Sequence, residues 1–274
     1  MKHLPEVSAY YERFAEESRL ASGPPRLEFE RTKEVLSRHL PAPPARVVDV
    51  GGAAGVYSAW LAELGYDVHL VDASSRLVDL ARARNATLRR PIASAAVGDA
   101  RRLPQADGAA DAVLVMGPLY HLPSPDDRAA ALREAFRVLA APGVVVVAAI
   151  SRYASALDGL ALNRTVDPAF VRIRDRDLVD GQHRNETDHP DYFTTAYFHR
   201  PEDLHAELEG AGFQDVTTLG VEGPGWMLAD FDARWANAAL RKEILHLARS
   251  LESERSILGV SPHLLGIGRK AGPS

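Results

Sequence analysis

A cluster of glycines behind an acidic residue is the part of this sequence with the clearest chemical potential. Residues 46–58 read RVVDVGGAAGVYS, so a β-branched run passes through Asp49 into Gly51, Gly52 and Gly55. Glycine lets the backbone bend sharply and leaves no Cβ between the main chain and a ligand. The pattern predicts a first strand, a tight turn that holds a nucleotide-like ligand, and a helix that begins directly afterwards.

Two classes of ligand use such a turn, and the glycine spacing separates them. A dinucleotide-binding turn has the pattern G-x-G-x-x-G, with a helix N-terminus aimed at a pyrophosphate. Here Ala53 and Val56 occupy the second and third glycine positions, which disfavours the alternative of an NAD(P)-dependent oxidoreductase. The other register, acidic-x-Gly-x-(Gly/Ala)-x-Gly, is met by Asp49, Gly51, Ala53 and Gly55.

The second register resembles motif I of the class I S-adenosylmethionine (SAM) methyltransferases, in their small-molecule branch of ubiquinone- and menaquinone-methyltransferase-like enzymes. In that family the loop wraps the amino-acid end of SAM. The resemblance therefore implies cofactor contacts from Asp49, Gly51, Gly52, Ala53 and Gly55. The sequence departs from the family pattern at Ala53, where the middle glycine is replaced. An alanine there predicts a negative φ, because positive φ angles favour glycine.

Residues at the ends of the next three predicted strands complete the expected cofactor site. Asp72 ends the second strand, where a carboxylate can accept both hydrogen bonds of a ribose diol. Asp99 and Ala100 follow a short third strand, and the resemblance implies that they hold the adenine. Met116 and Gly117 end the fourth strand, which in the family lies beside the sulfonium. The product would be S-adenosylhomocysteine (SAH).

The candidate catalytic residues come directly after the fourth strand. SAM already carries a reactive methyl group, so the protein must mainly hold the acceptor in line with the S–CH3 bond and exclude water. A base is needed only if the acceptor has to lose a proton. His121 is the favoured base because imidazole titrates near neutrality, with Tyr120 and His183 as further candidates. A histidine that only hydrogen-bonds the backbone near the cofactor is an equally open interpretation of His121.

The alternation of strands and helices stops over residues 151–199, a polar segment that carries several aromatic residues. Connections inside compact domains are usually short, so this insertion predicts a functional lid. In the resembled family such an insertion builds the acceptor pocket, which makes His183, Tyr192 and Tyr197 candidates for substrate binding. N-terminal helices of the family fold over the cofactor, which adds Tyr11. The histidine spacing and the lack of cysteines predict no metal site.

The repeated alternation of strand and helix predicts an α/β fold. We expect a Rossmann-like, seven-stranded, mostly parallel sheet with helices on both faces, and the resemblance implies one antiparallel strand near its end. A single methyltransferase domain over 1–274 would consist of a helical cap at 1–40, a SAM-binding core at 45–150, the lid at 151–199, and the C-terminal half of the sheet at 200–274.

Composition restricts the partners of this 274-residue chain. Its net charge of -5 gives no basic footprint for nucleic acid. The N-terminus has no signal-peptide pattern, and the longest apolar run, Val144 to Ile150, is too short to span a bilayer. We therefore expect a cytoplasmic protein without a membrane partner, in an oligomeric state that the sequence leaves open.

These observations predict a SAM-dependent methyltransferase that acts by in-line displacement. Its acceptor would be the O, N or C atom of a small organic molecule, of the kind found in secondary metabolism. A non-catalytic SAM-binding regulatory protein is a second alternative, because intact cofactor motifs do not by themselves require turnover.

Overall fold

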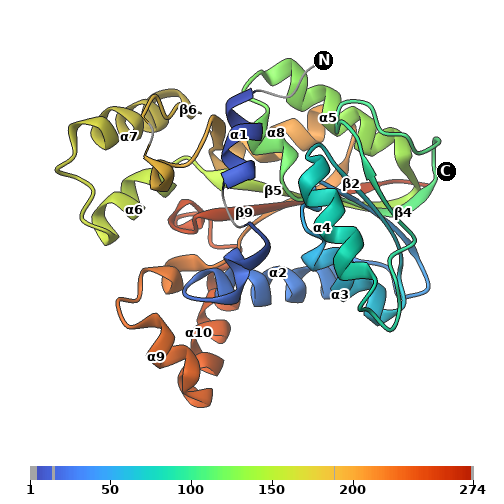
Figure 1. Cartoon of the computed structure of the whole chain (residues 1–274), viewed down its shortest axis with the longest axis horizontal. Helices are drawn as coiled ribbons and strands as arrows, with labels where there is room; N and C mark the ends of the chain where they lie inside the picture. Colours follow the sequence, from blue (N-terminus) through green and yellow to red (C-terminus); the bar gives the residue numbers. More distant parts are fainter. Residues whose placement is uncertain (1–4, 14–15, 188, 273–274) are drawn as a thin grey trace.

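The computed structural model describes residues 5–13, 16–187 and 189–272, so parts of the expected cap, at 1–4 and 14–15, lie outside the described residues. The described part is a mixed α/β fold around one sheet (Figure 1). The strands are β1 (Arg46–Val50), β2 (Asp67–Asp72), β3 (Ser94–Val97), β4 (Ala110–Val115), β5 (Leu139–Ser151), β6 (Gln182–His183), β7 (Ala196–His199), β8 (Gln214–Gly220) and β9 (His263–Lys270).

The first five strands form the parallel part of the sheet, in the order β3-β2-β1-β4-β5. Strand β9 runs antiparallel to β5, and β8 pairs antiparallel with β9. This is the mostly parallel sheet, with an antiparallel strand near its end, that the sequence predicts. The continuous valine run of β5 fits a strand covered on both faces, because four successive valines there are almost fully buried.

The sheet has nine strands among the described residues, so the prediction of seven was too low. The two additional strands come from the insertion. Strand β7 pairs in parallel with the last two residues of β5, and β6 pairs antiparallel with β7. Strands of two and four residues carry no readable alternation, because a period-two pattern needs more positions to show. The insertion thus adds two short strands to the sheet, next to the C-terminal end of β5.

Helices cover both faces of the sheet (Figure 1). The helices are α1 (Pro5–Arg13), α2 (Pro25–His39), α3 (Val56–Leu64), α4 (Ser75–Asn85), α5 (Pro125–Val138), α6 (Ala154–Ala161), α7 (Pro168–Asp180), α8 (Pro201–Gly210), α9 (Phe231–Ala236) and α10 (Ala238–Leu251). Short 3-10 turns are η1 (Glu16–Ala21), η2 (Pro118–His121), η3 (Pro190–Tyr192), η4 (Gly223–Met227) and η5 (Leu258–Val260). Among the described residues, no helix combines the length and the apolar character needed to cross a membrane.

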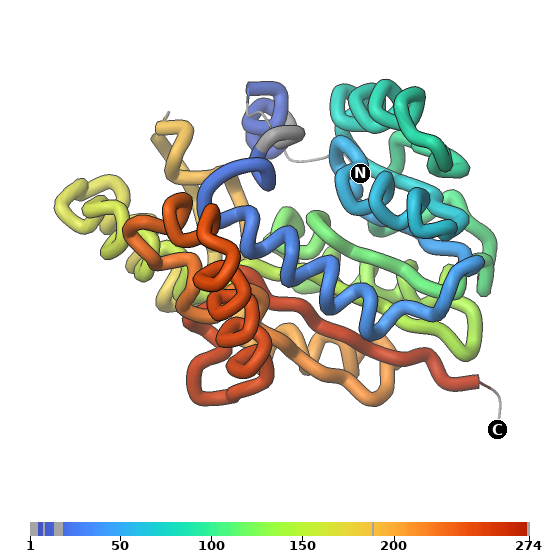
Figure 2. Tube along the Cα trace, turned by 90° about the horizontal axis from the view of Figure 1, so that it is seen from below, coloured from blue at the N-terminus to red at the C-terminus, as the bar shows by residue number. Residues whose placement is uncertain are grey.

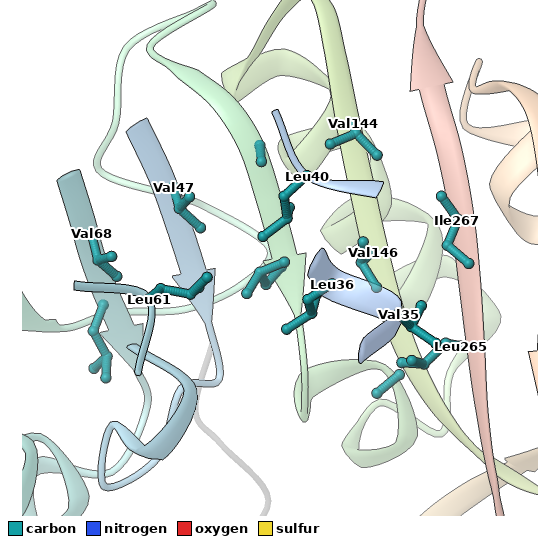
Figure 3. Packing of buried hydrophobic residues seen from close by; sticks show 14 of the residues in the cluster. Val35, Leu36, Leu40, Val47, Leu61, Val68, Val144, Val146, Leu265 and Ile267 are labelled. Atoms are coloured by element: carbon teal, nitrogen blue, oxygen red, sulfur yellow. The ribbon is translucent and has the colours of Figure 1, made fainter. Parts of the chain in front are cut away.

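One core lies between the sheet and helices α2 and α3. Figure 3 shows Leu36 of α2 and Leu61 of α3 facing strand residues such as Val47 and Val146. A second core lies on the opposite face, where α5 and α8 contribute Leu132 and Leu208. Burying one leucine side chain contributes about 2 kcal/mol to folding. Because many such side chains hold the helices against both faces of the sheet, the strand ends that carry the polar residues keep fixed positions.

Helix α2 also carries a buried cation. The side chain of Arg31 is fully buried, its Nε donates to the carbonyl of Val221 over 3.3 Å, and its guanidinium pairs with Glu34 and Glu252. Figure 2 shows α2 running along the sheet with α9 and α10 beside its first turns, where Leu27 packs in a small apolar cluster. Arg31 therefore connects α2 to the segments that precede η4 and follow α10.

Candidate active site

A cavity of about 590 Å³ opens at the carboxyl ends of β1, β2, β3 and β4. Parallel strands present their carboxyl ends on one edge, so residues far apart in sequence meet there. Most of the predicted site residues line this cavity: Tyr11, Gly51, Gly52, Ala53, Asp72, Asp99, Ala100, Met116, Gly117, Tyr120 and His121. The predicted cofactor residues Asp49 and Gly55 do not line it.

The glycine loop after β1 has the conformation that its glycines suggest. Gly51 and Gly55 have φ angles of 73° and 75°, in the left-handed region, and Gly55 is the N-cap of α3. The loop also lies against η2, because a Cβ on Gly51 would come within 2.3 Å of Cδ of Pro118. Glycine is required at position 51 for both reasons.

Ala53 corrects one prediction. Its φ is 47°, so the negative φ that the sequence analysis assigned to this alanine was wrong. The backbone N–H of Ala53 donates to Oδ2 of Asp72 over 2.9 Å, which ties the loop to the end of β2. A left-handed conformation costs a non-glycine residue about 1 kcal/mol. A hydrogen bond to a charged acceptor contributes a similar amount, so the bond to Asp72 is of the size needed to offset this cost.

Substituting Ala53 with glycine is therefore expected to stabilise the protein slightly. Relief of the left-handed strain should exceed the entropy that glycine adds to the unfolded chain, for a net gain of about 0.5 kcal/mol in the free energy of unfolding. Urea unfolding of Ala53→Gly and of the wild-type protein measures the difference. A loss of stability would show that Ala53 is not strained.

Asp49 lies beneath the loop. Its side chain is fully buried, and one carboxylate oxygen accepts a 2.6 Å hydrogen bond from Oγ of Ser58 on α3. Burial raises the pKa of Asp49 to about 6, opposed by the Ser58 bond and assisted by the negative charge of Asp72. In this position Asp49 supports the strand-to-helix turn, and a direct contact with the cofactor stays a prediction.

The two other acids of the predicted cofactor site are fixed by short local bonds. Asp72 accepts from the backbone N–H of Ser74 over 2.8 Å through its second oxygen. Asp99 accepts from the guanidinium of Arg101, which also pairs with Asp127 over 3.1 Å. Burial acts to raise the pKa of Asp99, but the hydrogen bonds and charge of Arg101 outweigh it and lower that pKa. Asp99 is thus an ionised acceptor whose orientation is set by Arg101.

His121 is buried at the base of the cavity, with 6% of its surface exposed. Its Nε2 is 2.8 Å from the hydroxyl of Tyr11, and its Nδ1 is 3.4 Å from the carbonyl of Thr195. Both ring nitrogens are therefore engaged. The neighbouring Tyr120 donates to the carbonyl of Met116 over 3.3 Å. A catalytic role for His121 or Tyr120 stays a prediction, and for His121 it would require the contact with Tyr11 to open.

Helix α1 and the insertion meet over this cavity. Oγ1 of Thr195 donates to the carboxylate of Glu6 on α1 over 3.1 Å. From the other side, the guanidinium of Arg76 on α4 donates to the carbonyl of Tyr11 over 2.7 Å. These bonds hold α1 between the insertion and α4, and a position of α1 over the cofactor stays a prediction.

A second cavity, of about 770 Å³, adjoins the first. Residues of α6, α7 and η3 line it together with residues of η4 and α9, so it lies between the insertion and the C-terminal helices. Six residues line both cavities: Arg19, Glu28, Ile150, Phe193, Phe198 and His263. The two spaces therefore meet at a shared wall, which we call the junction.

The predicted substrate residues of the insertion occupy different places. His183 and Tyr192 line the second cavity, but His183 is buried with its nitrogens on Asp177 and the carbonyl of Tyr192, both at 2.8 Å. Tyr197 is not among the lining residues of either cavity, and its ring lies 3.7 Å from the guanidinium carbon of Arg128. Their roles in substrate binding stay predictions.

The junction carries a charged cluster that the sequence analysis did not find. The guanidinium of Arg19 donates to both carboxylate oxygens of Glu28, and Nδ1 of His263 bonds to Glu222 and lies 3.7 Å from Glu28. Ligand atoms of Glu28, Glu222 and His263 lie within 4.8 Å of one another, so they could also hold a metal ion, although no metal site was expected. No signal in the sequence links these residues, because they come from η1, α2, the N-cap of η4 and the start of β9.

Charges within the cluster shift its titration. Burial acts to lower the pKa of His263, but the carboxylates of Glu28 and Glu222 outweigh it and raise that pKa to about 9. Burial acts to raise the pKa of Glu28, but the charges of Arg19 and His263 lower it to about 2. The two cations, Arg19 and His263, thus balance the two carboxylates, Glu28 and Glu222, at the junction.

Comparison with known proteins agrees with this geometry. Residues 47–143 match a family described as a methyltransferase domain. Demethylmenaquinone methyltransferase of Beutenbergia cavernae is 32% identical over 181 residues, which cover 64% of this chain and 70% of the relative. A SAM-dependent methyltransferase structure from Mesorhizobium loti has a TM-score of 0.56 at 21% identity, over 89% of this chain and 100% of that chain. A possible histamine N-methyltransferase from Thermotoga maritima has a TM-score of 0.57 at 19% identity, over 96% and 99%.

The glycine loop on an open α/β sheet, with acids at the ends of the next two strands, is the geometry of a nucleotide-binding enzyme, and the family match identifies the class. The chain belongs to the class I SAM-dependent methyltransferases. Its cofactor is SAM, and SAH is the corresponding product.

Proposed function

We propose that the protein methylates a small organic acceptor that reaches the cofactor through the second cavity. The observation that carries this proposal is the junction, where six residues line both cavities. Each cavity has a volume typical of a small-molecule site, which is a few hundred cubic ångströms up to about 1,000 Å³. Among the described residues, only these side chains line both cavities, so an acceptor in the second cavity would be next to a group held in the first.

The residues around the first cavity fit SAM. Asp72 would accept from the ribose hydroxyls, Asp99 and Ala100 would hold the adenine, and the loop at Gly51 would surround the methionine end. Asp72 and Asp99 both line the cavity with their orientation fixed by backbone or guanidinium donors. When bound, SAM supplies an electrophilic methyl group. The protein's own task is then to align the acceptor and exclude water, which the covering α1 and insertion support.

The acceptor side of the proposal rests on the second cavity and on the curated relative. The relative from Beutenbergia cavernae is named for a quinone-type acceptor, demethylmenaquinone. Phe170, Phe193, Phe198, Trp226 and Phe231 all line the second cavity, which suits a planar apolar molecule. A quinol or another small aromatic is therefore the acceptor class that we propose, with Tyr11, His183 and Tyr192 among the residues around it.

Acceptor-dependent release of SAH tests the function. The full chain is first titrated with SAH and with NAD⁺ by calorimetry, and SAH alone is expected to bind. It is then incubated with methyl-labelled SAM and a panel of quinols, phenols and amines, and labelled product is expected only with an aromatic acceptor. Binding of NAD⁺ instead of SAH would contradict the cofactor assignment. Tight SAH binding without turnover on any member of the panel would favour the regulatory alternative.

A further inference from the structure

The junction offers a histidine whose two nitrogens are in different situations. Nδ1 of His263 bonds to Glu222 and faces Glu28 at 3.7 Å. Among the residues that the structure describes, its Nε2 has no hydrogen-bond partner, and the side chain keeps 28% of its surface exposed while lining both cavities. This contrasts with His121 and His183, whose nitrogens are both engaged. His263 is thus placed to act on a molecule at the junction.

Hydrogen bonds and strand pairing hold His263 in place. Glu222 is almost fully buried, accepts from Oγ of Ser261 over 2.6 Å, and also accepts from the backbone N–H of His263 over 3.3 Å. The position of the residue is set by the sheet, because His263 pairs with Ile150 in the register between β9 and β5. An imidazole whose Nδ1 is held by a carboxylate presents Nε2 in a fixed direction. His263 lines both cavities, so its side chain is at the junction.

We propose that His263 binds the methyl acceptor as an oxyanion, so that the acceptor is a phenol or an enol that is ionised at the junction. This inference rests on the proposed function and assigns a further substrate-binding residue to it. Three charged groups of the described residues face the imidazole. Glu222, which follows β8, and Glu28 of α2 favour its positive charge, and Arg19 of η1 opposes it. Two carboxylates against one guanidinium favour imidazolium. A protonated Nε2 can only donate a hydrogen bond, so a protonated amine, which also only donates, would find no acceptor there.

The reaction balances with this assignment. The hydroxyl proton of the acceptor leaves to solvent, or to a neutral His263, and either route gives the same pair of imidazolium and oxyanion. A lone pair of the oxyanion forms the new O–CH3 bond while the S–CH3 bond breaks and its electrons stay on sulfur. The negative oxyanion and the positive sulfonium become a neutral ether and neutral SAH. His263 keeps its proton through the transfer step.

A competing use of the same residues is a divalent metal site. Glu28, however, already accepts two hydrogen bonds from Arg19, at 2.5 and 2.8 Å, and its second cationic neighbour is His263. A metal would have to displace Arg19 from Glu28 and remove the proton from His263. The observed ion pairs therefore favour oxyanion binding, and metal binding becomes an outcome that the test must distinguish.

The ionisation of a bound phenol tests the proposal directly. The full-length wild-type protein, saturated with SAH, is titrated with para-nitrophenol, whose phenolate absorbs visible light, at a pH below the pKa of the free phenol. The bound probe is expected to show phenolate absorbance, because a neighbouring cation lowers the pKa of a phenol by about one unit or more. In His263→Gln, which keeps a neutral donor at this position, the phenolate should bind roughly tenfold more weakly.

Two further variants separate binding from structural effects. Glu222→Gln keeps the shape of the side chain that holds Nδ1 but removes its negative charge, which lowers the pKa of His263. Phenolate binding is lost as the pH rises through that pKa, so the pH of this loss should fall by about one unit. His205→Gln, on the exposed face of α8, is the matched control and should bind the probe as the wild type does. All variants are first tested for SAH binding, which His263→Gln and Glu222→Gln are expected to retain.

The outcomes are distinguishable. If SAH does not bind the wild-type protein, the proposed function fails. If SAH binds but the phenol stays protonated in the wild-type complex, or ionises equally in His263→Gln, only the role of His263 is overturned. The same titration is repeated with EDTA and with added Mg²⁺ or Zn²⁺. Ionisation that requires a divalent ion would overturn the proposal in favour of a metal site.

Discussion

Replacing Asp72 with alanine is expected to weaken SAH binding roughly 100-fold. Two hydrogen bonds from ribose hydroxyls to an ionised carboxylate contribute about 3 kcal/mol together, and this substitution removes both. The same change also removes the acceptor that holds Ala53 at its positive φ. The loss of affinity should therefore appear in calorimetric titrations with SAH.

Two controls isolate the contribution of Asp72. Asp79→Ala removes the same charge from an exposed position of α4, where the aspartate pairs with Arg82, and it should leave SAH affinity unchanged. Asp72→Asn keeps one acceptor oxygen for the loop and should fall between the wild type and Asp72→Ala. Full SAH affinity in Asp72→Ala would show that the cofactor lies elsewhere.

The part of the site that could be predicted is the part encoded locally. The glycine loop and Asp72 stand immediately after β1 and at the end of β2. A parallel sheet brings the carboxyl ends of its strands to one edge, so the position in the chain alone indicates that such residues meet. Lining of one cavity by Gly51, Asp72 and Asp99 follows from that rule.

The junction could not be predicted because its residues meet only through tertiary packing. Arg19 and Glu28 precede the first strand, and His263 opens the last one. Nothing in the local sequence of His263 marks it, since its position in the cluster depends on Glu222 and Glu28, which come from other elements.

The backbone of Ala53 could not be predicted for the same reason, although the contact involved is a single hydrogen bond. Its backbone follows the hydrogen bond to Asp72 and not the intrinsic preference of alanine.

His121 illustrates a different limit. Its type and its position after the fourth strand indicate a base, and the structure does place it in the lining of the first cavity. Chain position gives no information on which atoms each ring nitrogen meets. In the folded protein those atoms are the hydroxyl of Tyr11 and the carbonyl of Thr195, from α1 and the insertion. A functional histidine therefore has to be chosen by the availability of its nitrogens, which favours His263.

Replacing Arg31 with alanine is expected to lower the free energy of unfolding by about 3 kcal/mol. The substitution removes a fully buried side chain and leaves the buried carbonyl of Val221 without the donor it has in the wild type. It also removes one cation from Glu252, and breaking a buried ion pair is strongly destabilising even where a second partner remains.

Arg38→Ala is the matched control, because Arg38 pairs with the same carboxylate of Glu252 from a partly exposed position. An exposed partner contributes little, so this variant should lose less than about 1 kcal/mol. Urea unfolding at neutral pH measures both variants, and Arg31→Met separates loss of volume from loss of charge. If Arg31→Ala were as stable as Arg38→Ala, burial would not be what makes the Arg31 network strong. Because Glu28 lies one helical turn before Arg31 on α2, such a result would also weaken the case that α2 holds the junction rigidly.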